Sequence, residues 1–176
     1  MVSINCQMPD PVIYYTTDGS DPTASSSRYE KPFALYKGGM VKAVAMIDNN
    51  KQQSEIVSMN YDIAPVKWSI VSHKWEEVAK VIDGDPVSSV RIDKGQPLTI
   101  DLGESLRLKG FVYTPVNRIE APNIYRYTFS VSYDKKQWKT VRQSAVFNNI
   151  RNNPIPQQVL FETPVNARYI KLEAIE

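Results

Sequence analysis

Cysteine and histidine are almost absent from this sequence, which holds one of each among its 176 residues. Because Cys6 is alone, the chain can form no internal disulfide. Cys6 and His73 together are too few to build a zinc site of the usual ligand set. No apolar run approaches the roughly 20 residues that a membrane-spanning helix needs, so we expect no membrane span. The N-terminus also lacks a basic segment followed by an apolar stretch, which predicts no signal peptide here.

Charge is nearly balanced and is spread along the chain. Residues 1–63 carry five Lys/Arg and seven Asp/Glu, whereas residues 64–176 carry sixteen and twelve. The basic residues of the second part are interleaved with acidic ones, while a nucleic-acid surface gathers them on one face or in one run. We therefore expect no nucleic-acid partner.

Short segments with alternating apolar residues dominate the sequence. Residues 98–102, 128–133 and 168–174 each place their apolar side chains on one face of an extended strand. Asp-Gly, Gly-Gly and Asn-Asn-Pro turn signals separate such segments, and twelve scattered prolines oppose long helices. One helix of about two turns is expected at residues 75–82, with Val78, Ala79 and Ile82 on its buried side. The pattern predicts an all-β protein.

A boundary is expected at residues 61–65, where a strand pattern ends, a proline follows and a new apolar run begins. The chain then holds two domains, residues 1–63 and 64–176. Each is large enough for a small core, but neither reaches the roughly 250 residues of a catalytic barrel. Asp18 and Asp21 are the one acid pair worth weighing as a general acid/base couple. No further polar group accompanies them, so turn stabilisation is the better interpretation.

Residues 13–23 carry the most specific motif of the first domain, IYYTTDGSDPT. It is followed by SRYEKPF at residues 27–33 and MVKAVAM at residues 40–46. This order resembles the small immunoglobulin-like domain at the C-terminal end of chitobiases and β-hexosaminidases. The resemblance implies a spacer or packing module without chemistry of its own.

The second domain shows a series of landmarks in a fixed order. They are WSIVS at 68–72, VIDGDP at 81–86, PLTIDLG at 97–103, LKGFVYTP at 108–115, IYRYTFSVSYD at 124–134 and ARYIKL at 167–172. The order resembles the coagulation factor V/VIII type C (discoidin) domain, which includes the family-32 carbohydrate-binding modules of bacterial glycoside hydrolases. The resemblance implies a jelly-roll β-sandwich, so the whole fold is expected to be two β-sandwiches in tandem. The family's last strand has no counterpart here, which suggests a domain truncated at its C-terminus.

The discoidin resemblance implies a structural calcium site in the loop after the short helix. Its ligands would be the Lys80 carbonyl, the Asp83 carboxylate, an oxygen of Asp85 and the Ser88 hydroxyl. Oxygen ligands of these types suit a hard cation. The family's further acidic ligand lies on the missing strand, and a simple tight turn at residues 83–86 is the alternative interpretation.

The family's galactose-binding residues are not present, because Val90, Arg91 and Val116 occupy the positions of its Trp, His and Arg. A sugar site would instead use an aromatic face and planar polar groups near the expected loop end. The candidates are His73, Trp75, Arg91, Asn117, Arg118 and Tyr125. His73 could be an ordinary surface residue, Trp75 a core anchor of the helix, and Arg118 an ion-pair partner of Glu120. Tyr133, Trp138 and Phe147 are expected in the core.

These observations predict a non-catalytic accessory region of a secreted glycoside hydrolase such as a chitobiase, hexosaminidase or fucosidase. The first domain would be a spacer and the second a weak glycan binder that tethers the enzyme to substrate. The alternative is that both domains pack against the catalytic domain of the same parent chain and bind no glycan. The resemblance implies a monomeric fragment located in the periplasm, at the cell surface or outside a bacterial cell.

Overall fold

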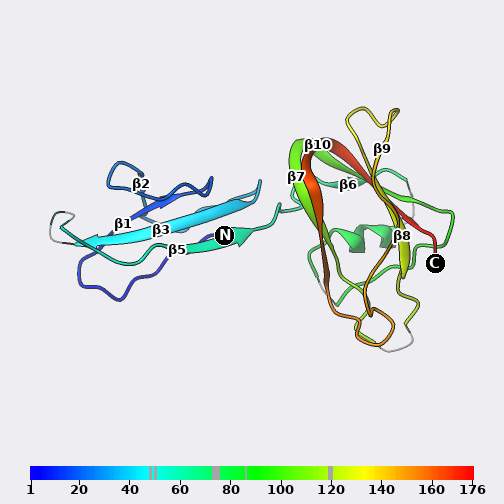
Figure 1. The fold of residues 1–176 in the computed structure, drawn as a ribbon, viewed down its shortest axis with the longest axis horizontal. Coiled ribbons are helices and arrows are strands. Elements are labelled where there is room, and N and C mark those ends of the chain that lie inside the picture. The colour runs from blue at the N-terminus through cyan, green and yellow to red at the C-terminus, as the bar shows by residue number, and fades with distance from the viewer. Residues whose placement is uncertain (48, 50, 73–75, 86, 119–120) are drawn as a thin grey trace. The chain divides into compact units, whose positions relative to one another are not determined.

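The computed structural model describes residues 1–176 except 48, 50, 73–75, 86 and 119–120. The chain divides into two compact units, Met1–Val66 and Lys67–Glu176. Each unit holds a five-stranded antiparallel sheet, and no α-helix occurs in the part of the chain so described (Figure 1). The predicted all-β class is confirmed. Nor does any described helix combine the length and hydropathy that a bilayer crossing requires.

The first unit is built around one long strand, β3. Strand β1 pairs with β3 on one side, β5 and β4 pair with it on the other, and β2 extends the sheet beyond β1. The strands span Val12–Thr16 (β1), Ser27–Arg28 (β2), Gly39–Ile47 (β3), Gln52–Gln53 (β4) and Val57–Tyr61 (β5). Because Val41 and Ala43 on one face of β3 and Val44 and Met46 on the other are all buried, β3 forms the centre of this core.

The predicted turn after β1 is held together by its polar side chains. Asp18 Oδ1 accepts hydrogen bonds from the Ser20 amide at 3.0 Å and the Ser20 hydroxyl at 2.6 Å. These bonds, the hydroxyl bond first, hold the pKa of Asp18 below its usual value. Asp21 instead forms an ion pair with Lys42 at 2.6 Å. The two carboxylates thus serve the turn and the adjoining strand, as turn-stabilising acids do.

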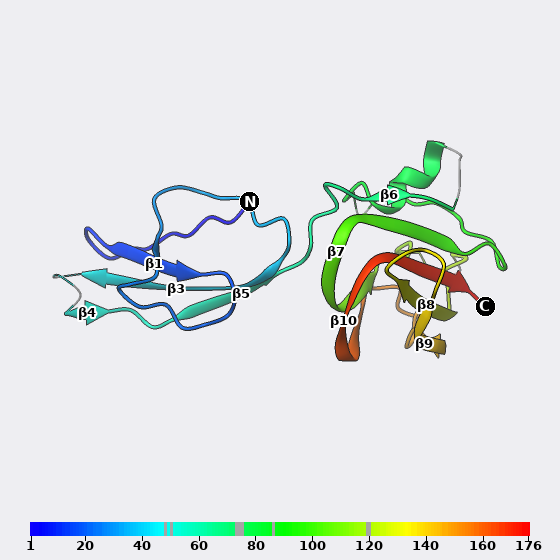
Figure 2. The same cartoon turned by 90° about the horizontal axis from the view of Figure 1, so that it is seen from above.

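The sheet of the second unit has the order β6-β7-β10-β8-β9. Its strands span Ser69–Ile70 (β6), Leu98–Tyr113 (β7), Arg126–Ser132 (β8), Lys139–Val146 (β9) and Gln157–Ala174 (β10). The two longest, β7 and β10, pair with each other and curve together (Figure 2). Both bend because their ladder is interrupted twice, between Leu160 and Val165 and between Ala167 and Tyr169.

Glycine permits the bend on the β7 side. Gly103 has a φ of +81° and lies where β7 faces the second interruption of β10. A Cβ atom at Gly103 would meet the Lys67 side chain at 2.7 Å, so only glycine fits there without displacement.

Stacked aromatic rings form the core of the second unit. Tyr127 and Phe147 stack with centroids 4.1 Å apart, and Phe111 and Phe129 stack at 4.2 Å. Phe147 is only 1% exposed, which confirms its predicted place in the core. These rings stabilise the core of the second unit largely by burying apolar area.

The predicted helix at residues 75–82 is only partly correct. The described helix is a 3-10 helix, η1, over Glu76–Val81. Val78 is buried as predicted at 5% exposure, but Ala79 is exposed. A 3-10 helix has three residues per turn, so residues one apart, such as Val78 and Ala79, point in directions well separated around its axis.

Candidate functional site

The structure brings together the four residues of the predicted calcium loop. Ser88 Oγ lies 2.7 Å from Asp83 Oδ2, 3.2 Å from the Lys80 carbonyl oxygen and 3.2 Å from the Asp85 carbonyl oxygen. A hydroxyl has one hydrogen to donate, so it can satisfy only one of these three acceptors. The cluster therefore holds more acceptor oxygens than donors, which is the composition that attracts a hard cation.

The loop's two carboxylates are fixed by backbone amides. Asp83 Oδ1 accepts a hydrogen bond from the Asp85 amide at 2.8 Å, and Asp85 Oδ1 accepts one from the Val87 amide at 2.9 Å. The Asp85 amide, then the Ser88 hydroxyl and the charge of Lys80 hold the pKa of Asp83 below its usual value. Asp83 is thus ionised at neutral pH and offers Oδ2 to the cluster. In the described residues no three His, Cys, Asp or Glu side chains come together, so a metal here would depend on carbonyl and hydroxyl oxygens as well.

The structure describes four of the six predicted sugar-binding residues, namely Arg91, Asn117, Arg118 and Tyr125. His73 and Trp75 lie outside the described residues, as does Glu120, the expected partner of Arg118. Arg91 Nε forms an ion pair with Asp93 Oδ1 at 2.8 Å, on an exposed loop. Asn117 and Arg118 are exposed between β7 and β8.

Tyr125, just before β8, has the guanidinium group of Arg151 over its ring. The guanidinium carbon of Arg151 lies 4.3 Å from the centroid of the Tyr125 ring, and Arg151 also pairs with Glu176. One face of this ring is therefore occupied by a cation rather than open to a sugar.

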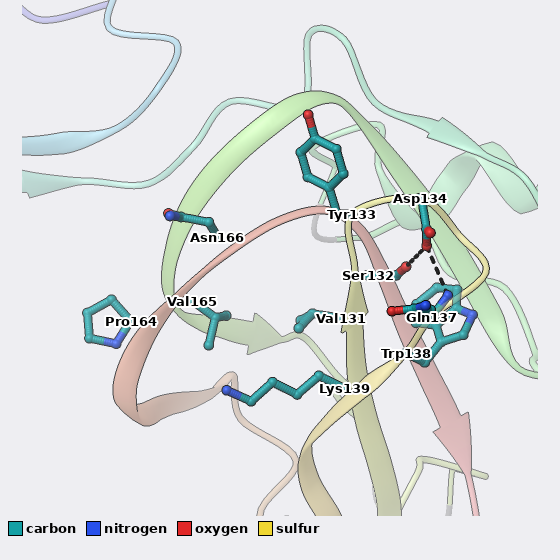
Figure 3. A pocket seen from close by; sticks show the side chains of 10 residues that line it. All are labelled: Val131, Ser132, Tyr133, Asp134, Gln137, Trp138, Lys139, Pro164, Val165 and Asn166. Atoms are coloured by element: carbon teal, nitrogen blue, oxygen red, sulfur yellow. Dashed lines mark hydrogen bonds between the residues drawn. The ribbon is translucent and has the colours of Figure 1, made fainter.

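A pocket opens elsewhere in the second unit, where β10 separates from β8. Strand β10 pairs with β8 only from Tyr169 to Ala174, and the bulge just before Tyr169 turns β10 away. The opening lies between the β8–β9 hairpin and the bent part of β10, and its volume is about 670 Å³. Residues 131–134, 137–139 and 164–166 line it (Figure 3).

The lining combines apolar aliphatic side chains with an aromatic and polar rim. Val165 and Pro164 supply the accessible aliphatic surface, Val131 is buried beneath the opening, and Tyr133, Asn166 and Lys139 extend around it (Figure 3). Tyr133 is 72% exposed, so its predicted place in the core is wrong. Its alternation with Phe129 and Val131 would continue the buried face, but β8 ends at Ser132 and the chain turns before Tyr133 can pack inward.

The hairpin turn beside the pocket is held by Asp134. Its Oδ1 accepts hydrogen bonds from the amides of Lys136 at 2.8 Å and Gln137 at 2.9 Å and from the Ser132 hydroxyl at 3.2 Å. These bonds, the Gln137 amide first, lower the pKa of Asp134. Lys135 adopts a φ of +64°, which completes the tight turn. The rim is therefore fixed without a ligand.

Trp138 is half-buried, whereas the sequence predicts it in the core. Its indole nitrogen donates to the Lys135 carbonyl at 3.2 Å, and the Lys171 ammonium lies 4.3 Å from its ring centroid. Trp138 thus supports the turn and holds a lysine from β10, which leaves Tyr133 as the freer aromatic surface of the pocket.

Comparison with known families accounts for the architecture of both units. The F5/8 type C domain family matches residues 65–176. The chain belongs to the F5/8 type C domain family. The Fn3 associated family matches residues 2–61, so the first unit is similar to that family. The finer resemblance of the first unit to chitobiases stays a prediction.

Solved structures share the fold of the F5/8 type C unit. One is CBM32-1 from a family 31 glycoside hydrolase of Clostridium perfringens, at 19% identity and a TM-score of 0.53, covering 64% of this chain and 86% of that one. A pectin binding carbohydrate binding module has 19% identity and a TM-score of 0.52, covering 63% and 78%. A third, from Clostridium perfringens, is CpGH89CBM32-5 in complex with GalNAc-β-1,3-galactose, at 21% identity and 0.50, covering 62% and 84%. No curated protein matches the chain.

The predicted aromatic residue Tyr125 and the pocket residue Tyr133 lie at opposite ends of β8. Tyr125 immediately precedes β8 and Tyr133 immediately follows it. A strand of seven residues spans about 20 Å, so the predicted aromatic and the pocket lie at opposite ends of β8. The pocket is therefore a site that the sequence-based candidates do not include.

Proposed function

We propose that this chain is a non-catalytic accessory region of a carbohydrate-active enzyme and that its F5/8 type C unit binds a glycan. The observation that carries the proposal is an open pocket whose lining includes the exposed Tyr133 ring and, on its other side, the aliphatic side chains of Val165 and Pro164. The carbohydrate-binding modules that share its fold support the same class of function. One of them is named as coming from a family 31 glycoside hydrolase, and another is named as a complex with a disaccharide.

The pocket offers the two kinds of contact that a sugar ring needs. The C–H face of one sugar unit can pack on the Tyr133 ring and that of another on Val165 and Pro164, while hydroxyl groups can bond to the Asn166 amide or to Gln137. Because the pocket is open, we expect affinity in the weak range typical of a tethering module, which acts by raising local substrate concentration.

The first unit then serves as a spacer between this binding unit and the rest of the parent chain. The polar turns and the ion pairs of its surface need no ligand to account for them. We further propose that a calcium ion, held by Lys80, Asp83, Asp85 and Ser88, stiffens the loop after η1. Its role would be structural, and the parent protein would act in the periplasm, at the cell surface or outside the cell.

Affinity electrophoresis on a panel of immobilised polysaccharides, backed by a glycan array, tests the proposal. We expect the chain to be retarded by at least one polymer and Tyr133→Ala to lose about tenfold in affinity. That estimate assumes about 50 Å² of ring surface covered by the sugar at 25 cal/mol per Å². Tyr36→Ala removes another exposed tyrosine from the first unit and should bind as the wild type does.

Two results would redirect the proposal. Loss of binding in Tyr125→Ala but not in Tyr133→Ala would move the site to the opposite end of β8. A blank array together with no retardation would reject glycan binding. Destabilisation of the parent enzyme on removal of this region would then favour the packing role instead.

A further inference from the structure

Positive side chains surround the pocket at the β8–β9 end in excess over negative ones. The hairpin supplies Lys135, Lys136 and Lys139, and β10 supplies Lys171, which lies over the Trp138 ring. Among the lining residues Lys139 is the basic side chain and Asp134 the acidic one. This concentration contrasts with the interleaved charges of the rest of the second unit.

The acidic neighbours of the pocket are already committed to other partners. Asp134 Oδ1 accepts three hydrogen bonds from the turn. Asp101 is bound by Arg168 through Nε at 2.9 Å and Nη2 at 3.0 Å, so this pair contributes little net charge. Lys139, by contrast, has no ion pair within the described part of the chain.

The position of Lys139 suits a ligand that carries its own negative charge. Lys139 opens β9 opposite Val131, and its side chain extends along the pocket toward the β10 side, beneath Val165 (Figure 3). A sugar unit packed on Val165 would therefore present a substituent at its edge to the Lys139 ammonium, while the Tyr133 ring lies on the other side of the opening (Figure 3). Such a group would relieve the mutual repulsion of the nearby lysines.

We infer that the pocket selects an acidic saccharide, one with a carboxylate or sulfate group placed to pair with Lys139. The inference rests on the proposed glycan-binding function and specifies its ligand class. Lys139 supplies the contact that depends on the ligand's charge, and Tyr133 and the aliphatic side chains supply packing that does not. Lys135, Lys136 and Lys171 raise the local positive potential.

A matched pair of polymers tests charge selection. Polygalacturonate and its carboxyl-reduced neutral form share a backbone and differ in the charged group, and alginate and chondroitin sulfate extend the acidic set. We expect the chain to bind at least one acidic polymer and to prefer polygalacturonate or its oligomers over the reduced form. The preference should fall as salt rises from about 0.05 to 0.5 M, because exposed ion pairs are screened.

The variants separate charge from packing. Lys139→Gln should weaken binding of the acidic ligand about twofold to fivefold, the range of one partly exposed ion pair. It should weaken binding of the acidic ligand more than that of a neutral sugar, and Lys139→Arg should keep the preference. Lys94→Gln removes an exposed lysine from a loop away from the pocket lining and serves as the control. Tyr133→Ala should weaken acidic and neutral ligands alike.

The outcomes distinguish this inference from the proposed function. Equal affinity for the charged and reduced polymers, or no effect of Lys139→Gln, would overturn the acidic selection while glycan binding stands. Absence of binding to every saccharide would overturn both. Equal retention by a single-stranded oligonucleotide, lost in Lys139→Gln, would show that the lysines attract any polyanion and would overturn saccharide selection.

Discussion

Calcium should raise the melting temperature of the F5/8 type C unit. The loop offers the Ser88 hydroxyl and three oxygens around it, those of the Asp83 carboxylate and of the Lys80 and Asp85 carbonyls. So few ligands are typical of weak extracellular calcium sites, whose Kd is on the order of 10⁻⁴ to 10⁻³ M. At about 10 mM free calcium, such binding stabilises the folded state by about 1.4 to 2.7 kcal/mol. A unit of about 110 residues has an unfolding entropy near 0.23 kcal/mol per kelvin, so the midpoint should rise by about 6 to 12 °C.

Differential scanning calorimetry in calcium and in a chelator, at matched ionic strength, measures this shift. Asp83→Asn removes the charge that faces Ser88 and should abolish most of the calcium-dependent rise. Asp93→Asn alters an exposed carboxylate of a neighbouring loop, paired with Arg91, and should leave the rise intact. An unchanged midpoint in the wild type would refute the argument that the crowded acceptors mark a cation site. An equal rise in both variants would place the ion elsewhere.

Other predictions concern the frame of the pocket. Asp101→Asn should cost about 1 to 2 kcal/mol in urea titrations, because the largely buried side chain loses its charge and one of its two bonds from the half-exposed Arg168. The pKa of Asp101 is lowered in the folded state, chiefly by the Arg168 bonds. Its contribution is therefore complete above the unfolded-state pKa of about 4 and is lost as pH falls through the folded value, where wild type and variant should converge. Gly110→Ala should cost at least about 2 kcal/mol and reduce soluble yield, since its Cβ would lie 2.1 Å from the Val159 carbonyl oxygen. Phe147→Ala should cost about 3 to 5 kcal/mol by the same titration.

Alternation in the sequence was sufficient to predict the strands that have one buried face. Leu98, Ile100 and Leu102 are all buried in β7 as their spacing indicates, and Phe129 and Val131 are buried in β8. Such patterns succeed because a strand has a strict period of two, so burial of one face constrains every second residue. The turn at Asp18 was equally accessible, because the side chains that hold it lie within three residues of one another.

The pocket could not be predicted in the same way. Tyr133 continues the apolar alternation of β8 and differs from Phe129 and Val131 only because the strand has ended. The end of a strand is set by turn hydrogen bonds, here those to Asp134. The alternation of apolar residues carries no information on these bonds. One signal was present in the sequence: Pro164 cannot donate to a ladder, so a proline inside a long strand indicates an interruption. That interruption adjoins the part of β10, residues 164–166, that lines the pocket.

The geometry of the opening and its chemistry have separate origins. Strands β8 and β10 diverge because the bulges of β10 and the glycine at position 103 of β7 let the two long strands curve, and these are features of the backbone. The side chains at the opening are set by local sequence: the hairpin that connects β8 and β9 carries three lysines, and its one acid, Asp134, is held in the turn by backbone amides. A relative with the same bend could therefore keep the cavity while exchanging Lys139 for a neutral residue and would lose charge selection without losing the fold. Ligand class in this unit should accordingly follow the β8–β9 hairpin sequence more closely than overall identity, which is why relatives near 20% identity establish the architecture but not the saccharide.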